Sequence, residues 1–473
     1  MQVGSQKEFQ LYDEALLEKG YTMNQLIGFA AIGLSKQPIQ ANKIGIVCGN
    51  GNNGADGLAL ALMLQEKHQV TVYLTSVTGS LSVSHYLGKV VESGIVVHDG
   101  ISLIDQEDLI IDAIFGSGLN RDVSGKYYDI IEKINTLDKP VIAIDIPSGL
   151  DCNSGLPKNI SIKATQTRTI CAYKQGFLLP HSKEYTGDIM LCPLVEKEVP
   201  FSTVVDNRII QSIIKKRKYD DYKGKYGKVI HITGSNEYIG AATLAAKSSV
   251  YSGSGLVCCY SSSEVLTSVT INVPECIVKK RINTLDPIIY QHYDALLIGS
   301  GLGLDFSSEK YVEDVLEKST IPMVIDGDGL TYVAMHLESL KKAHAPVILT
   351  PHIGEFKRLH PFYNETDYVL LAKEFALKWG VILVLKGPNT IVTNGNDTYR
   401  NTTGNSAMAS AGSGDVLAGM IVSFLGQGYG PIEASIQAVY LHGLCGDIVA
   451  NDNYTAVASK VIELIPKAMK RII

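Results

Sequence analysis

Short apolar runs alternate along the chain with longer segments in which apolar residues recur at helical spacing. The first half predicts helices over 6–19 and 23–34 and strands over 43–48, 109–113, 141–144, 169–173 and 189–191. The second half predicts strands over 229–232, 256–260, 295–298, 323–325, 347–349 and 382–385, closed by helices that start near Asp415 and Glu433. Apolar strands separated by helices indicate parallel sheets covered on both faces. The predicted fold class is α/β, with two three-layer α/β/α domains.

Length and charge support two domains and exclude one class of partner. A chain of 473 residues is too long for one ordinary hydrophobic core. Its 42 basic and 48 acidic residues are mixed along the chain, with a net charge of −6 and no basic stripe, so we expect no nucleic-acid partner. The densest basic run, 215–218, precedes an aspartate pair and is typical of a solvated linker. We place the domains at 1–205 and 223–473, with a linker over 206–222.

Cysteine usage and hydropathy bear on location. The eight cysteines are scattered with no C-x-x-C pair, which is typical of a reduced, cytoplasmic protein. The polar start of the chain predicts no signal peptide, and no apolar stretch is long enough to span a bilayer. We expect a cytoplasmic protein without a membrane partner. We also expect it to form a homo-oligomer.

A loop of small residues, Ser410 to Gly414, runs directly into an apolar helix. The free backbone N–H groups and the positive end of the helix dipole make such a loop a seat for an anionic oxygen. Asp415 stands in the first turn of that helix. A carboxylate there would repel a resting phosphate, so we interpret it as a base that acts on an attacking hydroxyl. The alternative is an ordinary helix start in which Asp415 is a partner of the dipole.

Three strand ends upstream carry polar residues. The strand over 382–385 is followed by Lys386 to Thr390, and the segments 321–328 and 347–356 repeat the pattern of an apolar strand and then polar residues. Open α/β sheets bind ligands at the carboxyl ends of their strands, so these ends and the small-residue loop predict one site. Taken singly, each is more often a plain strand end.

These residues resemble the ribokinase-like superfamily, and within it the branch that dehydrates NAD(P)H hydrates at the expense of ADP or ATP. The matching segments are TGSNEYIGA (233–241), IGSGLG (298–303), IDGDGLT (325–331), LTPHIGEFKRL (349–359), LKGPNTIV (385–392) and GNSAMASAGSGDVLAG (404–419). The resemblance implies a ribokinase-like C-terminal domain that uses Mg²⁺ with ADP or ATP. The residues do not choose between the two nucleotides.

The same resemblance implies two sets of contacts in this half. It places nucleotide contacts at Lys386, Gly387, Pro388, Asn389, Thr390, Gly412, Ser413 and Gly414. It places substrate contacts at Ala242, Gly303, His352, Glu355 and Asp415. His352 has a structural alternative, because a lone histidine at a strand end is more often a hydrogen-bonded structural residue.

The first half contains a glycine-rich turn of its own. The strand over 43–48 leads into Gly49 to Gly57 and then into an apolar helix over 58–64, which is the order of a Rossmann-type phosphate-binding crossover. The turn is neither GxGxxG nor a P-loop, and three asparagines and an aspartate stand among its glycines. Amide and carboxylate oxygens suit hard cations and sugar hydroxyls. The alternative is a polar turn with left-handed Asn and Gly residues.

Two further strand ends belong with this turn. Asp112 lies at the end of one strand, and Asp145 and Ser148 follow the next, so we expect all three along the same sheet edge as Asn53. Oxygen ligands without a nearby His or Cys favour an alkali or alkaline-earth ion over zinc. An N-cap for the next helix is the alternative for Asp145.

GNGNNGADG, DAIFGSGLNRDVSG and IDIPSGLD resemble the NAD(P)H-hydrate epimerase family, also called the YjeF N-terminal domain, which implies a Rossmann-like fold. The resemblance implies a potassium ion held by Asn53, Asp112 and Ser148. It implies substrate contacts from Asn52, Asn53, Gly54, Ala55, Asp56, Gly116, Ser117, Gly118, Leu119, Asn120, Arg121, Asp122 and Asp145. Asp145 is also our candidate for the acid or base of epimerisation.

Together the two resemblances predict a metabolite-repair enzyme whose substrates are hydrated NADH and NADPH. The N-terminal domain would interconvert the R and S hydrates. The C-terminal domain would dehydrate the S form with ADP or ATP, through Asp415, and release AMP or ADP and phosphate. One alternative is a small-molecule kinase, such as a vitamin-precursor kinase, with a non-catalytic N-terminal domain. Another is a binding or scaffold protein with a degenerate N-terminal domain.

Overall fold

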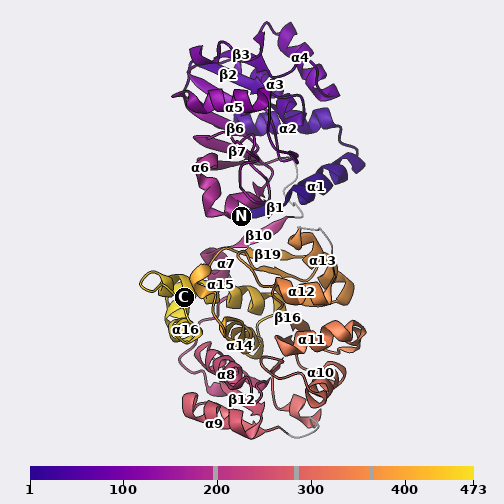
Figure 1. Cartoon of the computed structure of the whole chain (residues 1–473), viewed down its shortest axis with the longest axis vertical. Coiled ribbons are helices and arrows are strands. Elements are labelled where there is room, and N and C mark those ends of the chain that lie inside the picture. The colour runs from indigo at the N-terminus through magenta and orange to yellow at the C-terminus, as the bar shows by residue number, and fades with distance from the viewer. Residues whose placement is uncertain (195–200, 282–286, 362–366) are drawn as a thin grey trace. The chain divides into compact units, whose positions relative to one another are not determined.

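The computed structural model describes residues 1–194, 201–281, 287–361 and 367–473. The chain forms two compact units, Met1–Ser202 and Thr203–Ile473 (Figure 1). Each unit is an α/β structure built on a mainly parallel sheet, which confirms the predicted fold class. The segment 206–222, which we predicted to be a linker, lies in unit 2. It contains α7 (Asn207–Ile213), whose Ile210 is fully buried in the core of that unit.

The sheet of unit 1 has seven parallel strands in the order β4-β3-β2-β5-β6-β7-β9. The strands are β2 (Lys43–Cys48), β3 (Gln69–Leu74), β4 (Val96–Asp99), β5 (Leu109–Ala113), β6 (Val141–Ile144), β7 (Gln166–Ile170) and β9 (Asp188–Cys192). Along β2, Ile44 and Ile46 enter one apolar cluster and Val47 enters another, because successive side chains point to opposite faces. The strand order reverses between β2 and β5, where α/β sheets of this type bind ligands.

Helices cover both faces of this sheet. They are α1 (Gln6–Glu18), α2 (Met23–Ser35), α3 (Asn52–Leu64), α4 (Leu81–Glu92), α5 (Lys126–Thr136) and the short α6 (Lys183–Thr186). The prediction that the helix after β2 begins at Leu58 was wrong, because α3 begins at Asn52. Gly54 makes the early start possible, since a Cβ there would lie 1.9 Å from the carbonyl oxygen of Gly49. The asparagines of the turn therefore stand on a helix.

The strand predicted over 169–173 was also placed wrongly. β7 ends at Ile170, and the chain turns at Cys171, whose φ of 69° lies in the left-handed region, before the short strand β8 (Tyr173–Lys174). β8 pairs in parallel with β1 (Gln2–Gly4), which precedes α1. The apolar stretch that predicted one strand is therefore divided between two, because the turn at Cys171 redirects the backbone.

The sheet of unit 2 has strands in the order β13-β12-β11-β14-β15-β16-β17-β18-β19-β10. They are β10 (Ser202–Val205), β11 (Lys228–Ile232), β12 (Leu256–Ser261), β13 (Ile277–Lys280), β14 (Ala295–Ile298), β15 (Met323–Ile325), β16 (Val347–Leu349), β17 (Ile382–Leu385), β18 (Ile391–Thr393) and β19 (Thr398–Asn401). The strands from β13 to β17 are parallel, and β17, β18 and β19 form an antiparallel meander. The order reverses between β11 and β14, so the carboxyl ends of these strands are again the ligand edge.

The helices of unit 2 fall into two groups, one for each main apolar cluster of the unit (Figure 1). One group holds α7, α8 (Ile239–Tyr251), α9 (Ser263–Asn272), α14 (Ser413–Gly426), α15 (Pro431–Ala450) and α16 (Ala458–Ile472). The other holds α10 (Phe306–Lys318), α11 (Asp328–Met335), α12 (Ile353–Leu359) and α13 (Tyr368–Trp379). We predicted that the helix near Glu433 closes the domain, whereas α16 follows it and buries Val461, Ile462 and Ile465.

Candidate active sites

Unit 1 contains a cavity of about 690 Å³ at the carboxyl ends of β2 and β5. Residues from the turn after β2 and from the first turns of α3 form one wall, and the loop after β5 forms another. Of the substrate contacts predicted for this unit, those that line the cavity are Asn52, Asn53, Asp56, Gly116, Ser117, Gly118, Leu119, Asn120, Arg121 and Asp145. The cavity thus brings together three chain segments that the sequence placed only at strand ends.

Three of the predicted contacts lie elsewhere. Ala55 is fully buried among the apolar residues between α3 and the sheet, and Gly54 packs against Gly49. Asp122 is exposed and is not part of the cavity wall. Because α3 begins at Asn52, only one side of its first turns faces the cavity, and Gly54 and Ala55 point away from it.

Two of the predicted metal ligands, Asp112 and Ser148, are buried and hydrogen-bonded to each other, and the third, Asn53, lines the cavity. Asp112 accepts hydrogen bonds from the Ser148 backbone N–H at 2.8 Å and from the Ser148 hydroxyl at 2.5 Å. Burial raises the pKa of Asp112 to about 6, although these hydrogen bonds oppose the shift. The Asn53 side chain is 7% exposed, and neither its amide oxygen nor its amide nitrogen has a hydrogen-bond partner among the described residues. A buried amide without partners is rare and indicates a site for a ligand.

Asp145 lies at the end of β6 with a φ of 67°, an uncommon conformation for a residue other than glycine. Its carboxylate forms an ion pair with Lys174, whose side chain is 1% exposed, and accepts a hydrogen bond from the Ile170 backbone N–H at 3.2 Å. Backbone strain of this kind persists only where the surroundings hold it in place, and it is concentrated at functional sites. We had not assigned Lys174 a role, because the pairing joins residues 29 positions apart on β6 and β8.

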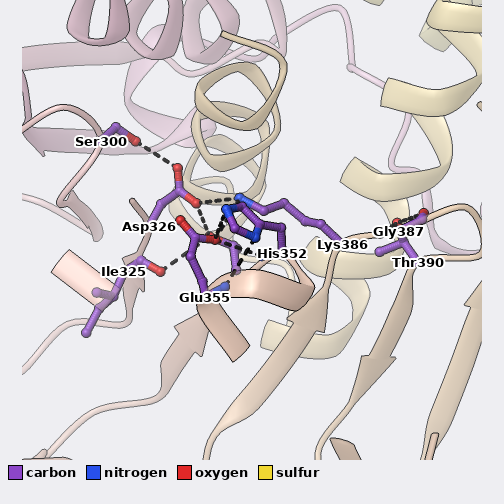
Figure 2. A network of polar contacts seen from close by, with 9 residues as sticks. Ser300, Ile325, Asp326, His352, Glu355, Lys386, Gly387 and Thr390 are labelled. Atoms are coloured by element: carbon purple, nitrogen blue, oxygen red, sulfur yellow. Dashed lines mark hydrogen bonds and ion pairs between the residues drawn. The ribbon is translucent and has the colours of Figure 1, made fainter. Parts of the chain in front are cut away.

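In unit 2, four consecutive parallel strands, β14 to β17, deliver polar residues to one point (Figure 2). Asp326, after β15, accepts hydrogen bonds from the Ser300 hydroxyl at 3.2 Å and the Thr350 hydroxyl at 2.7 Å. It also accepts one from the Lys386 ammonium at 3.0 Å, and Glu355 lies 3.8 Å from that ammonium. The predicted convergence of these strand ends is therefore observed.

Charge balance decides the protonation of this cluster. Burial favours the neutral form of Asp326, but Lys386 and the two hydroxyl donors more than offset it and lower the pKa of Asp326. Burial also disfavours the Lys386 ammonium, yet Asp326 and Glu355 raise its pKa above the usual value. Asp326 itself was not among our predicted site residues. An aspartate directly after a buried strand was the available signal.

The small-residue loop meets this cluster. A Cβ on Gly414 would lie 3.2 Å from the Lys386 ammonium, so Lys386 reaches the backbone that begins α14. Gly412 has a φ of 89°, and a Cβ there would lie 2.4 Å from Leu244, so both conformation and space require glycine. Burial and then the Asp326 charge raise the pKa of Asp415 to about 7, although Lys386 opposes the shift. Asp415 is therefore poised to exchange a proton near neutral pH.

His352 and Glu355 form a reciprocal cap at the start of α12. The Glu355 backbone N–H donates to His352 Nδ1 at 3.2 Å, and the His352 backbone N–H donates to the Glu355 carboxylate at 2.7 Å. This cap corresponds to the structural alternative for His352, whose backbone also pairs with that of Lys386 (Figure 2). Gly303, with a φ of 89°, donates its backbone N–H to Asp328 at 2.9 Å.

Two other residues of unit 2 have roles that the sequence did not predict. Ala242, a predicted substrate contact, is fully buried in the first turn of α8 and is a core residue in this structure. His442, which we had not singled out, lies on α15 with Nε2 3.3 Å from the Ser413 hydroxyl. Burial and the Lys386 charge lower the pKa of His442 to about 4, so a neutral imidazole supports the anion loop.

Across the described ranges, no helix is both long and apolar enough to cross a membrane. The same ranges contain no group of three or more His, Cys, Asp or Glu side chains arranged to hold a metal ion.

Comparisons with known proteins follow the division into two units. The model of the NAD(P)H-hydrate dehydratase family matches residues 229–467, and the model of the YjeF-related protein N-terminus matches residues 21–176. The chain is 32% identical to a bifunctional NAD(P)H-hydrate repair enzyme of Thermofilum pendens, over 99% of this chain and 96% of that protein. It is 31% identical to the enzyme of the same description in Dictyoglomus turgidum, over 92% of this chain and 91% of that protein.

Two solved structures are similar to the second half of the chain. One is an ADP/ATP-dependent NAD(P)H-hydrate dehydratase from Bacillus subtilis, co-crystallised with ATP and Mg²⁺. It is 30% identical, has a TM-score of 0.52, and the match covers 57% of this chain and 99% of that one. The other is a ribokinase-like superfamily protein from Enterococcus faecalis, 30% identical with a TM-score of 0.54, covering 59% of this chain and 99% of that one. They confirm the prediction of a ribokinase-like fold.

Proposed function

Because this chain belongs to the family of bifunctional NAD(P)H-hydrate repair enzymes, we propose that its two units divide the repair between them. Unit 1 interconverts the R and S forms of the hydrate. Unit 2 dehydrates the S form with ADP or ATP and releases AMP or ADP together with phosphate. Hydration of the nicotinamide ring creates a new stereocentre, and a chiral pocket processes one epimer, so epimerisation makes the other epimer available.

In this proposal Asp415 is the general base of the dehydratase. Hydroxide is a poor leaving group, so the ring hydroxyl is first phosphorylated. Asp415 takes the hydroxyl proton while the oxygen attacks the terminal phosphoryl group of the nucleotide. The ring nitrogen then expels phosphate, and loss of a proton from the neighbouring carbon restores the double bond. The observation that supports this role is the raised pKa of Asp415, about 7, beside an anion-binding helix start.

The nucleotide is proposed to lie along the small-residue loop and the segment after β17. The backbone of Gly412 to Gly414 would hold the transferring phosphoryl group. Lys386, which lies within reach of Gly414, would neutralise its charge, while Gly387 to Thr390 contact the rest of the nucleotide. Mg²⁺ would arrive on the phosphates of the nucleotide and screen their charge. His352, Glu355 and Gly303 stand at the neighbouring strand ends and are proposed to contact the hydrate.

The cavity of unit 1 is proposed to be the epimerase site. Asp145 would exchange a proton with the carbinol group. The cavity-lining residues Asn52, Asp56 and Gly116 to Arg121 would hold the substrate. Asn53, Asp112 and Ser148 fit a potassium ion, because together they offer one formal negative charge and neutral oxygens, and the Asn53 amide has no other partner among the described residues. Potassium bound there would partly neutralise substrate phosphate.

An equal mixture of the two epimers tests the division of labour. The intact chain with nucleotide and Mg²⁺ should convert all of the mixture to NAD(P)H. Asp145→Ala should convert about half quickly and the rest only at the spontaneous epimerisation rate, since one site alone is impaired. Asp415→Ala should regenerate almost no NAD(P)H while chromatography still shows the epimers interconverting.

Asp452→Asn is a suitable control, because Asp452 is exposed after the end of α15. It should behave as the intact chain. If Asp145→Ala consumes both epimers as fast as the intact chain, then unit 1 does not epimerise through Asp145. Rapid NAD(P)H formation by Asp415→Ala would remove Asp415 from the dehydratase mechanism.

A further inference from the structure

Helix α1 brings an additional carboxyl to the cavity of unit 1. Asp13 lies on this helix and lines the cavity together with Asp56 and Asp145. The Asn53 amide, which is 7% exposed and has no hydrogen-bond partner among the described residues, lines the same cavity and marks it as a ligand site. Asp13 was not among the predicted site residues, because nothing in the local pattern of an amphipathic helix separates it from a solvated charge.

The structure fixes α1 over the cavity through contacts at its start. β1 pairs with β8 in a register that places Gly4 opposite Lys174, and the Gln6 backbone N–H donates to the Asn153 side chain at 2.9 Å. The ring of Phe9, one turn into α1, lies 4.1 Å from the Lys174 ammonium. Asp13 is four residues further along, so it lies on the same face of the helix as Phe9. The helix therefore holds Asp13 on the cavity side.

The carboxyls of the cavity differ in their partners. Asp145 is paired with Lys174, which stabilises its carboxylate form. Asp13 has no ion pair among the described residues, and burial together with the Asp145 charge raises the pKa of Asp13 to about 6, although Lys174 opposes the shift. Asp13 is exposed to solvent although it lines the cavity, so it can exchange protons with water. Burial raises the pKa of Asp56 well above its usual value, and the charges of Asp145 and Asp13 add to the rise.

Other titratable and charged groups face this region. Glu14 stands next to Asp13 on α1 and adds to the rise in its pKa. Tyr12, Cys171 and Arg121 also line the cavity, and burial raises the pKa of Cys171 to about 11, which keeps the thiol neutral. Asp13 is therefore the carboxyl of the cavity that combines a raised pKa with exposure to solvent, whereas Asp145 is held in an ion pair. A group that titrates close to the working pH and can regain its proton from solvent suits a general acid.

We propose that Asp13 is a second catalytic carboxyl of the epimerase, which acts on the carbinol group as the proton-exchanging partner of Asp145. This proposal rests on the assignment of the unit 1 cavity as the epimerase site. It adds a residue from α1 to a site that the sequence placed entirely at strand ends. The two carboxyls come from different elements, α1 and the end of β6, and both line the cavity.

In one direction, epimerisation would run through loss and re-addition of water. Hydration of an enamine double bond places the hydroxyl on the carbon next to the ring nitrogen. Asp13 donates a proton to that hydroxyl, the C–O bond breaks, and the nitrogen lone pair forms a C=N bond as water leaves. Water then adds to the opposite face of the planar carbon while Asp145 takes a proton from it and the electrons return to nitrogen. The proton passes back from Asp145 to Asp13 through solvent at the open side of the cavity.

Asp13→Asn tests the proposal within the full-length protein. We expect the epimerisation rate at saturating substrate to fall by about two to four orders of magnitude, the range for loss of a positioned acid or base. Dehydration of purified S hydrate by unit 2 should stay unchanged and serves as an internal control for folding. Glu14→Gln removes a neighbouring carboxylate of α1 that is not part of the cavity wall and should epimerise at the rate of the intact chain.

The pH profile separates a proton-transfer role from a structural one. With Asp13 as the acid, the epimerisation rate should fall as the pH rises through about 6 and above, as Asp13 loses its proton. This falling limb should disappear in Asp13→Asn and return, with reduced rate, in Asp13→Glu. A higher KM with unchanged kcat in Asp13→Asn would overturn the proposal. The same falling limb in the intact chain and in Asp13→Asn would also overturn it.

A comparison of Asp145→Ala with Asp13→Asn separates failure of the Asp13 proposal from failure of the proposed function of unit 1. If Asp145→Ala loses epimerisation and Asp13→Asn keeps it, the cavity remains the epimerase site and the proposal for Asp13 fails. If the intact chain does not interconvert the epimers, the proposed function of unit 1 fails with it. A loss in Glu14→Gln equal to that in Asp13→Asn would also contradict the proposal, because α1 would then act only through its overall charge.

Discussion

Replacing Lys386 with methionine tests the charge balance at the centre of unit 2. The Lys386 side chain is 20% exposed and the Asp326 side chain only 4%, and their ammonium and carboxylate lie 3.0 Å apart. Methionine keeps most of the length of the side chain but removes the cation, so a buried carboxylate is left with hydroxyl donors alone. Breaking a buried ion pair from one side costs about 3–5 kcal/mol. We therefore expect Lys386→Met to lower the unfolding free energy of unit 2 by that amount at neutral pH.

The stability lost in Lys386→Met should depend on pH in a defined direction. In the intact chain the pKa of Asp326 lies below its usual value, so its contribution to stability is full at neutral pH and is lost only as the pH falls through that lowered pKa. The pKa of Lys386 is raised. The contribution of Lys386 to stability is therefore full below its ordinary pKa and is lost as the pH rises through the raised pKa. Without Lys386, burial raises the pKa of Asp326. The defect of Lys386→Met should therefore shrink as the pH falls from neutral, because Asp326 becomes protonated.

Urea unfolding followed by tryptophan fluorescence measures this for unit 2 alone. Trp379 is the single tryptophan of the chain and lies in α13 with 8% of its surface exposed. Asp326→Asn combined with Lys386→Met should recover a large part of the lost stability, since both charges are then absent. A loss below about 1 kcal/mol, typical of a solvated pair, would refute this account of the charge balance. A loss of stability in Lys386→Met that neither low pH nor Asp326→Asn relieves would also refute it.

Two further predictions concern the reacting groups. Single-turnover phosphoryl transfer to the S hydrate should speed up as the pH rises through about 7, because the base form of Asp415 is needed, and Asp415→Asn should be about two to four orders of magnitude slower without that rise. The same rising limb in Asp415→Asn would assign it to another group. Potassium chloride should raise the melting temperature of the intact chain more than choline chloride at equal concentration, and Asn53→Ala should remove the difference. Long-wavelength anomalous scattering should show potassium beside Asn53, and equal melting in both salts would count against the site.

Seven of the strands and the family were readable from the sequence alone. The observed bounds of β2, β5, β6, β14, β15, β16 and β17 match the predicted ones residue for residue. A parallel strand buried on both faces is written as a continuous apolar run, so local composition determines it. Polar residues directly after such runs also identified the ligand edges, because parallel strands end on the same side of a sheet.

The residue at which α3 begins, within the glycine-rich turn, could be found only from the structure. α3 starts at Asn52 because Gly54 can approach Gly49, and no periodic pattern reports a contact between backbones. The consequence reaches the site, since Gly54 and Ala55 then face the core while Asn53 and Asp56 face the cavity.

The sequence by itself determined the central strands of both sheets, the sheet edges predicted to bind ligands and the family that the chain resembles. Only the tertiary structure decided which charges meet: Lys174 with Asp145 in unit 1, and Lys386 with Asp326 in unit 2. Only the structure placed Asp13 of α1 at the cavity. These pairings join residues 29 and 60 positions apart, so they depend on strand order and register. The apolar periodicity that forms each element carries no information about which polar side chains become neighbours, whereas burial and distance set their protonation.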